Sequence, residues 1–217
     1  MVLFTRRFIL KDFFEKLDEQ KRERILNAAI KEFAYKKYED ASTNNIVSAA
    51  QIGKGMLFHY FGNKKNLYLY LYRYVREVMD KEIYSRIDYE SGVLPIILKQ
   101  LAKYNLETFK RHPSITDFIA QCNRETSPEV HDDIQDIRNE RGVKIKEDII
   151  YKNLDMKLLK PEFREKQTIK LIHWALDGYI SEIKGSYNGE NLDQLPVEEI
   201  MTDYDSYMDI ICKAFYL

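Results

Sequence analysis

Apolar side chains recur at intervals of three and four residues along most of this chain, which is the spacing of one face of an α-helix. No segment alternates apolar and polar positions for long enough to suggest a β-strand, and the five prolines lie at or near the starts of periodic segments. The pattern therefore predicts an all-α protein of about nine helices.

The first 65 residues contain three predicted helices and one tight turn. A helix capped by Asp18 is expected over residues 18–38, and a second helix follows a Ser42 cap. Residues 51–53 (Gln-Ile-Gly) form the turn to a short third helix that ends at Phe61. A helix-turn-helix in this position predicts an N-terminal DNA-binding domain over residues 1–65, with its core over 18–65.

A long fourth helix is expected to open at Asn63 and to continue past Tyr84, long enough to join the N-terminal module to the rest of the chain. Prolines open several of the later helices as first-turn residues. The later helices are expected over residues 92–111, 113–125, 128–154, 161–186 and 196–216, with a polar loop over 187–195. Residues 66–217 should thus form a second, helical domain.

The charge changes sign along the chain. Residues 1–65 hold 13 Lys and Arg against 8 Asp and Glu, whereas the whole chain of 217 residues has a formal charge of -1. A basic module joined to an acidic body suits a nucleic-acid reader with a regulatory domain, although charge alone does not distinguish DNA from RNA or an anionic membrane.

Other classes of function find no support in the residue pattern. Cys122 and Cys212 are far apart and lack metal or redox spacing, which fits a reducing cytoplasm. His112, His131 and His173 lack the i, i+4 spacing of helical metal pairs. The chain has no cofactor or catalytic motif and no apolar run of roughly 20 residues, so we expect no cofactor, no metal, no enzymatic activity and no membrane span.

The third helix has an outward face that suits a DNA groove. On a helix that begins at Gly53, an advance of about 100° per residue turns Leu57 and Phe61 inward. Gly55 and His59 then point outward, and Met56 and Phe58 flank them. This short face can enter a major groove.

The residue types on this face match the chemistry of DNA recognition. Lys54 can bind phosphate or guanine, and His59 can donate to a base or a phosphate. Met56 offers an apolar contact to a thymine methyl group, and Gly55 permits close approach of the backbone.

Two lysines open the fourth helix, where positive charge opposes the helix dipole. A DNA phosphate would reverse that penalty, because it would meet free backbone N–H groups as well as the ammonium groups of Lys64 and Lys65. Thr43 and Asn44, at the start of the second helix, can hydrogen-bond a further phosphate.

Together these residues resemble the TetR family of bacterial transcriptional regulators, over about the first third of the chain. The matching residues are Tyr38, Ser42, Ile46, Ala50, the run Lys54-Gly55-Met56-Leu57-Phe58-His59-Tyr60-Phe61, and Lys64. The chain departs from the family pattern at Gln51, where a turn glycine is usual, at Gly53, where a capping serine is usual, and at Phe58, where tyrosine is common.

The resemblance implies that five residues contact DNA, and that Tyr60 contacts the DNA backbone. The five are Thr43, Lys54, His59, Tyr60 and Lys64. An alternative for Tyr60 and Phe58 is that both are core aromatic residues.

The resemblance also implies a helical body that dimerises through its last two helices, and both of these helices carry strongly apolar stripes. A core within a single chain is the alternative. The residues expected at the dimer interface are Ile172, Leu176, Ile180, Ile183, Tyr204, Met208, Ile211 and Phe215.

A pocket for a small-molecule effector in the body is the remaining implication of the resemblance. An apolar or aromatic lining is expected, although each candidate also suits ordinary core or surface. The candidates are Tyr104, Phe109, Phe118, Tyr151, Trp174 and Tyr179.

The leading hypothesis is a cytoplasmic, nucleoid-associated bacterial repressor, homodimeric and ligand-responsive, that reads a palindromic operator through its third helix. Its expected partners are double-stranded DNA, a small-molecule effector and a second copy of the chain. A DNA-bound structural or division-control protein of the same fold is the alternative, and a ligand-binding or enzymatic body is a third interpretation.

Overall fold

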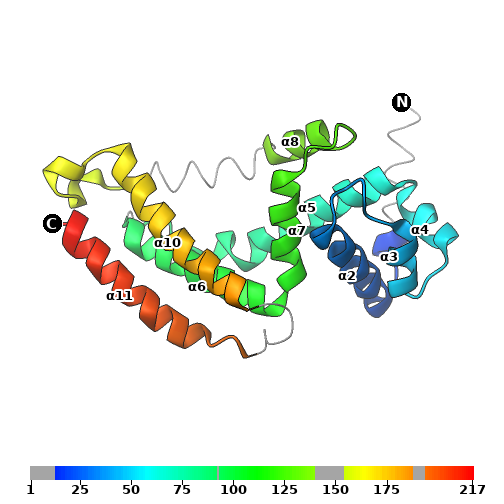
Figure 1. Ribbon diagram of the computed structural model, residues 1–217, viewed down its shortest axis with the longest axis horizontal. Coiled ribbons are helices and arrows are strands. Elements are labelled where there is room, and N and C mark those ends of the chain that lie inside the picture. The colour runs from blue at the N-terminus through cyan, green and yellow to red at the C-terminus, as the bar shows by residue number, and fades with distance from the viewer. Residues whose placement is uncertain (1–12, 92, 140–153, 188–193) are drawn as a thin grey trace. The chain divides into compact units, whose positions relative to one another are not determined.

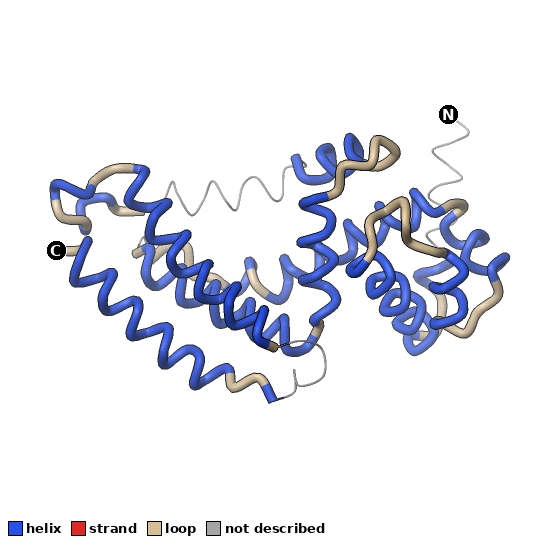
Figure 2. Tube along the Cα trace, in the orientation of Figure 1, coloured by secondary structure: helices blue, strands red, loops and turns tan. Residues whose placement is uncertain are grey.

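The computed structural model describes residues 13–91, 93–139, 154–187 and 194–217 (Figure 1). Within these ranges the regular structure is helical, apart from an isolated antiparallel bridge between Leu159 and Tyr216 (Figure 2). The prediction of an all-α fold is confirmed.

The helices, in chain order, are α2 Glu19–Tyr35, α3 Thr43–Ala49, α4 Lys54–Phe61, α5 Lys64–Glu82, α6 Leu94–Arg111, α7 Pro113–Arg124, α8 His131–Asn139, α10 Lys166–Ser186 and α11 Val197–Phe215. Short 3-10 helices cover Tyr84–Arg86, Met156–Leu158 and Pro161–Phe163.

The N-terminal helices begin close to where their sequence signals place them. Asp18 caps α2, because its carboxylate accepts the backbone N–H of Lys21 at 2.9 Å. The helix ends at Tyr35, earlier than expected, because Lys36 has an extended backbone. Ser42 precedes α3 as expected, but its side chain makes no capping hydrogen bond.

Later boundaries differ more from the expected ones. Helix α5 ends at Glu82 and gives way to a 3-10 turn. Helix α10 begins at Lys166, because Pro161–Phe163 forms a separate 3-10 turn. Of the helix expected over 128–154, the structure describes α8; residues 140–153 and most of the expected loop over 187–195 lie outside the described residues.

The chain forms two compact units, and the first is discontinuous in sequence. It comprises Met1–Val78 and Ser114–Asn139, whereas the second comprises Met79–Pro113 and Glu140–Leu217. Helices α7 and α8 therefore pack with the helix-turn-helix. The functional boundary expected at residue 65 stays a prediction.

An aromatic cluster forms much of the core of the first unit. Phe33 of α2 lies edge-on to Tyr68 of α5, with ring centroids 4.9 Å apart, and Phe118 of α7 is 5.4 Å from Tyr68. The hydroxyl of Tyr68 donates to the Cys122 sulfur at 3.2 Å, and burial raises the pKa of the Cys122 thiol to about 12. These contacts join α7 to α2 and α5.

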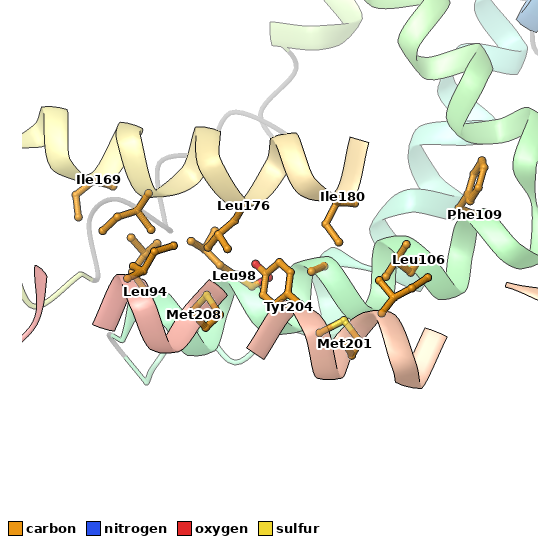
Figure 3. Close-up of a cluster of buried hydrophobic side chains, with 14 of the residues drawn as sticks. Leu94, Leu98, Leu106, Phe109, Ile169, Leu176, Ile180, Met201, Tyr204 and Met208 are labelled. Atoms are coloured by element: carbon orange, nitrogen blue, oxygen red, sulfur yellow. The ribbon is translucent and has the colours of Figure 1, made fainter. Parts of the chain in front are cut away.

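The core of the second unit lies between α6, α10 and α11 (Figure 3). Side chains from the three helices point toward one another, and Tyr204 of α11 donates its hydroxyl to the backbone oxygen of Leu98 at 3.2 Å. The cluster includes Leu94, Leu98 and Leu106 of α6, Ile169, Leu176 and Ile180 of α10, and Met201 and Met208 of α11.

Candidate DNA-binding surface

Helix α4 has the buried and exposed faces that its sequence predicts. Leu57 and Phe61 are buried, whereas Lys54, Gly55 and His59 are exposed. Met56 and Phe58 are half-buried at the margins of the exposed face. The buried face holds the helix on the first unit and leaves a short cationic and polar face open.

The backbone on either side of α4 adopts left-handed conformations. Gln51, in the turn before α4, has φ 54°, and Gly62, after α4, has φ 78°. Glycine adopts such angles without steric cost, whereas a residue with a Cβ does not. The positive φ at position 51 explains why a glycine is usual there in the family. In this chain Gln51 adopts the same backbone conformation at a steric cost.

One carboxylate organises the corner between α2 and α3. Glu32 accepts hydrogen bonds from the Lys36 ammonium at 2.8 Å, the Ser42 backbone N–H at 2.8 Å and the Asn45 amide at 3.2 Å. Burial acts to raise the pKa of Glu32, but these hydrogen bonds lower it below its usual value. The corner positions Thr43, which is half-buried, and Asn44, which is exposed, at the start of α3.

Lys64, at the start of α5, is already engaged within the chain. Its ammonium donates to the backbone oxygen of Glu39 at 3.1 Å and lies 4.8 Å from the centre of the Tyr38 ring. Asn63 accepts the backbone N–H of Asn66 at 2.8 Å and so caps the helix. Lys64 is therefore held in a defined position beside α4 rather than extended into solvent.

Lys65 has an acidic partner on another helix. Its ammonium is 2.6 Å from a carboxylate oxygen of Asp133 in α8. This ion pair offsets the unfavourable interaction of a lysine with the dipole at a helix start. From the sequence alone, that compensation was expected from a DNA phosphate. Asp133 would compete with DNA for Lys65.

Asp133→Asn should strengthen binding to an operator by about two- to fivefold at low salt, because Lys65 then has no competing carboxylate. The free energy of unfolding should change by less than about 1 kcal/mol, since both partners are partly exposed. Fluorescence anisotropy with labelled operator would measure the affinity. Asp136→Asn, a change of equal charge on α8, is the control, and an equal gain from both variants would contradict the specific role of Asp133.

Tyr60 is in a less open position than the family resemblance implies. It is 8% exposed, and its ring packs edge-on with that of Phe14 at 5.7 Å between centroids. This burial favours the alternative interpretation, in which Tyr60 is mainly a core aromatic residue of the first unit. A DNA contact through Tyr60 stays a prediction.

The loop between α7 and α8 supports the helix-turn-helix through a buried carboxylate that sequence reasoning did not single out. Glu125 is 6% exposed and accepts the backbone N–H groups of Tyr38 at 2.8 Å, Thr126 at 3.0 Å and Ser127 at 2.9 Å. Glu129 accepts the Tyr38 hydroxyl at 2.7 Å. Burial and Glu129 both raise the pKa of the Tyr38 phenol.

The eight residues expected at a dimer interface lie instead in or against the core of their own chain. Ile172, Leu176, Ile180, Tyr204, Met208 and Ile211 are buried, and Ile183 and Phe215 pack partly buried against the same cluster. These side chains meet α6 within the chain, which is the single-chain alternative. A dimer through α10 and α11 would have to use their other faces.

Those other faces carry exposed apolar side chains that the sequence reasoning did not assign to an interface. Trp174 and Leu171 on α10 are 70% and 53% exposed, and Ile210 and Tyr207 on α11 are 64% and 46% exposed. Leu171 and Trp174 are three residues apart, the spacing of one helix face, so a second apolar stripe was detectable.

The candidate effector-pocket residues are mostly engaged by their neighbours. The Arg86 guanidinium lies 3.9 Å from the centre of the Tyr104 ring, the Lys184 ammonium lies 5.6 Å from that of Phe109, and the Tyr179 hydroxyl donates to Asp203 at 2.8 Å. Phe118 belongs to the core of the first unit, Trp174 is exposed, and Tyr151 lies outside the described residues. The effector pocket stays a prediction.

Among the residues that the structure describes, no group of three or more His, Cys, Asp or Glu side chains could hold a metal ion. No helix among them has the length and apolar character needed to cross a membrane.

Comparison with known proteins gives consistent matches. The family model for bacterial regulatory proteins of the tetR family matches residues 25–71. The transcriptional repressor AcnR of Corynebacterium diphtheriae is 24% identical over 181 residues, which cover 81% of this chain and 87% of that protein.

Two solved structures share the fold over nearly their whole length. A TetR family regulator from Chloroflexus aurantiacus superposes with a TM-score of 0.69 at 19% identity, covering 95% of this chain and 98% of the other. The fatty acid degradation regulator FadR from Bacillus halodurans gives a TM-score of 0.52 at 17% identity, covering 84% of this chain and 96% of that chain.

The helix-turn-helix and the helical unit that follows it define a DNA-binding transcriptional regulator. Through residues 25–71, the helix-turn-helix region matches the TetR family of bacterial transcriptional regulators, as the sequence predicts.

Proposed function

We propose that this protein is a homodimeric, ligand-responsive repressor that reads a palindromic operator through α4. The observation that carries the proposal is the exposed face of Lys54, Gly55 and His59, whose helix is held by buried side chains on its other face. Lys64 and Lys65 at the start of α5 add positive charge for the DNA backbone. The name of AcnR as a repressor favours repression over activation.

The homodimer is supported by the outward faces of α10 and α11. Leu171, Trp174, Tyr207 and Ile210 would leave water if a second copy covered them, which would favour association. Gly178 lies four residues after Trp174, and a Cβ added there would meet nothing within 4 Å. Packing within the described part of the chain therefore does not require a glycine at this position. A two-fold dimer would present two α4 helices to two half-sites, as a palindrome requires.

The effector is the part of the proposal that rests on the family resemblance. A ligand that releases the repressor from DNA must bind less tightly to the DNA-bound dimer, because coupling between two sites is reciprocal. A regulator of chromosomal genes would act in the bacterial cytoplasm, on the nucleoid.

Lys54→Ala and Lys64→Ala should each weaken operator binding by about tenfold, because each removes an ammonium group that would neutralise a phosphate. The slope of log affinity against log salt should fall by about one in each variant. An operator for this measurement would come from selection of random DNA on the purified protein. Anisotropy titrations at several salt concentrations would then give affinity and slope together.

Lys157→Ala removes an exposed lysine from the second unit and is the matched control. Thermal unfolding of each variant would separate weaker DNA binding from lower stability, since Lys64 also packs on Tyr38. Unchanged affinity and salt slope in both Lys54→Ala and Lys64→Ala would refute the assignment of α4 and α5 to DNA binding.

A further inference from the structure

The residues just before α2 contact the helix proposed to read DNA. The Phe13 ring lies 5.9 Å from the His59 ring between centroids, at an interplanar angle of 46°. Phe13 is 52% exposed, and His59 is exposed on the outward face of α4. An aromatic side chain from outside the helix-turn-helix therefore lies against one of its central polar residues.

Phe13 is held in place by its neighbour along the chain. Phe14 is fully buried, and its ring centroid is 5.7 Å from that of Tyr60, 4.8 Å from that of Phe61 and 5.5 Å from that of Tyr70. A residue anchored between α4 and α5 in this way fixes the position of the backbone next to it.

Polar contacts fix the same segment from its other end. The Tyr70 hydroxyl donates to the Glu15 carboxylate at 2.8 Å, and the Arg22 guanidinium donates to the Glu15 backbone oxygen at 3.3 Å. The contact between Phe13 and His59 thus belongs to a segment that both packing and polar contacts hold against α4 and α5.

The Phe13–His59 contact is poorly explained by stability alone. A half-exposed phenylalanine contributes only part of the hydrophobic free energy of a buried one. The neighbouring Phe14, which is fully buried, already anchors this segment in the core. A ring packed against an exposed histidine leaves the histidine fewer rotamers, so less of its freedom remains to be lost on binding.

We infer that Phe13 is a positioning residue for DNA recognition, holding His59 in the orientation in which it donates to a base. The inference rests on the proposed function, in which the outward face of α4 enters the major groove. Double-stranded DNA is the partner that the surface fits, because Lys54 is exposed on α4 and Lys64 lies at the start of α5.

Phe13→Ala should weaken operator binding by about three- to tenfold, the range expected when one side chain must be ordered on binding. At the operator positions where His59→Ala reduces the preference for one base pair, Phe13→Ala should reduce that preference too. The salt slope should stay the same, because the variant keeps every lysine proposed to neutralise a phosphate. Phe13→Tyr keeps the ring and should restore both affinity and base preference.

A double-mutant cycle tests whether Phe13 acts through His59. In a His59→Ala background, Phe13→Ala should cause no further loss of affinity. Tyr35→Ala removes another exposed aromatic residue from the same unit and should leave binding unchanged. If Phe13→Ala lowers thermal stability, Phe13→Leu, which keeps most of the apolar volume, should still lose base preference.

Full affinity in folded Phe13→Ala, or an equal loss with and without His59, would overturn the positioning role while leaving the proposed function intact. Unchanged binding in both Lys54→Ala and His59→Ala would instead remove the proposed function itself, so the two failures are distinguishable.

Discussion

Trp174→Asp is expected to convert the proposed dimer into a folded monomer and to abolish tight operator binding. Trp174 is 70% exposed on α10, and its burial by a second copy would remove a large apolar side chain from water. A carboxylate placed there would be buried without a partner in both subunits. The dimer dissociation constant should rise by at least about a hundredfold, and analytical ultracentrifugation would measure it.

Two further variants make this experiment specific. Ile96→Asp places the same charge at an exposed apolar position on α6 and should leave the dimer intact. Leu176→Ala opens the chain's own core and should lower the free energy of unfolding by about 2–5 kcal/mol. A Trp174→Asp protein that sediments as a dimer would show that α10 does not form the interface through this face.

Glu125→Ala should lower the free energy of unfolding by about 2–5 kcal/mol, because two buried N–H groups lose their acceptor. These belong to Tyr38 and Ser127; the third donor, Thr126, is exposed and can bind water instead. Denaturant unfolding followed by circular dichroism would measure the loss. Operator binding should weaken too, since Tyr38 supports Lys64 through its ring.

Glu125→Gln separates loss of the acceptor from loss of side-chain volume. The glutamine retains one carbonyl oxygen but directs its amide group at one of the N–H donors, so an intermediate destabilisation is expected. Glu129→Gln, at an exposed position that still accepts the Tyr38 hydroxyl, should cost less than about 1 kcal/mol. Equal stability of Glu125→Ala and the unmodified protein would show that this carboxylate is dispensable.

The local pattern correctly predicted which face of α4 is buried, because orientation within a short helix depends only on residue spacing. Leu57 and Phe61 are buried and Gly55 and His59 are exposed, as an advance of about 100° per residue requires. The Asp18 cap was also predictable, since a capping side chain bonds the backbone three residues away.

Contacts between distant segments were not predictable in the same way. An apolar stripe shows that one face of a helix is covered but not what covers it, so Ile172 and Leu176 suited a dimer and a single-chain core equally. The partners of Lys65 and Tyr38 are carboxylates on α8 and on the loop before it, and no local periodicity relates such positions. Lys65, whose charge the sequence assigns to DNA, therefore has a partner within the protein.

The discontinuous first unit also sets an order of events during synthesis. Tyr38 and Glu125 are 87 residues apart along the chain, and the segment between them includes α6, which belongs to the second unit. Long-range closure of this kind is slow compared with local helix formation. A nascent chain that has made α4 but not α7 and α8 therefore lacks part of the support for its proposed DNA-binding surface. Operator binding should follow the completion of α8 rather than the appearance of α4 from the ribosome.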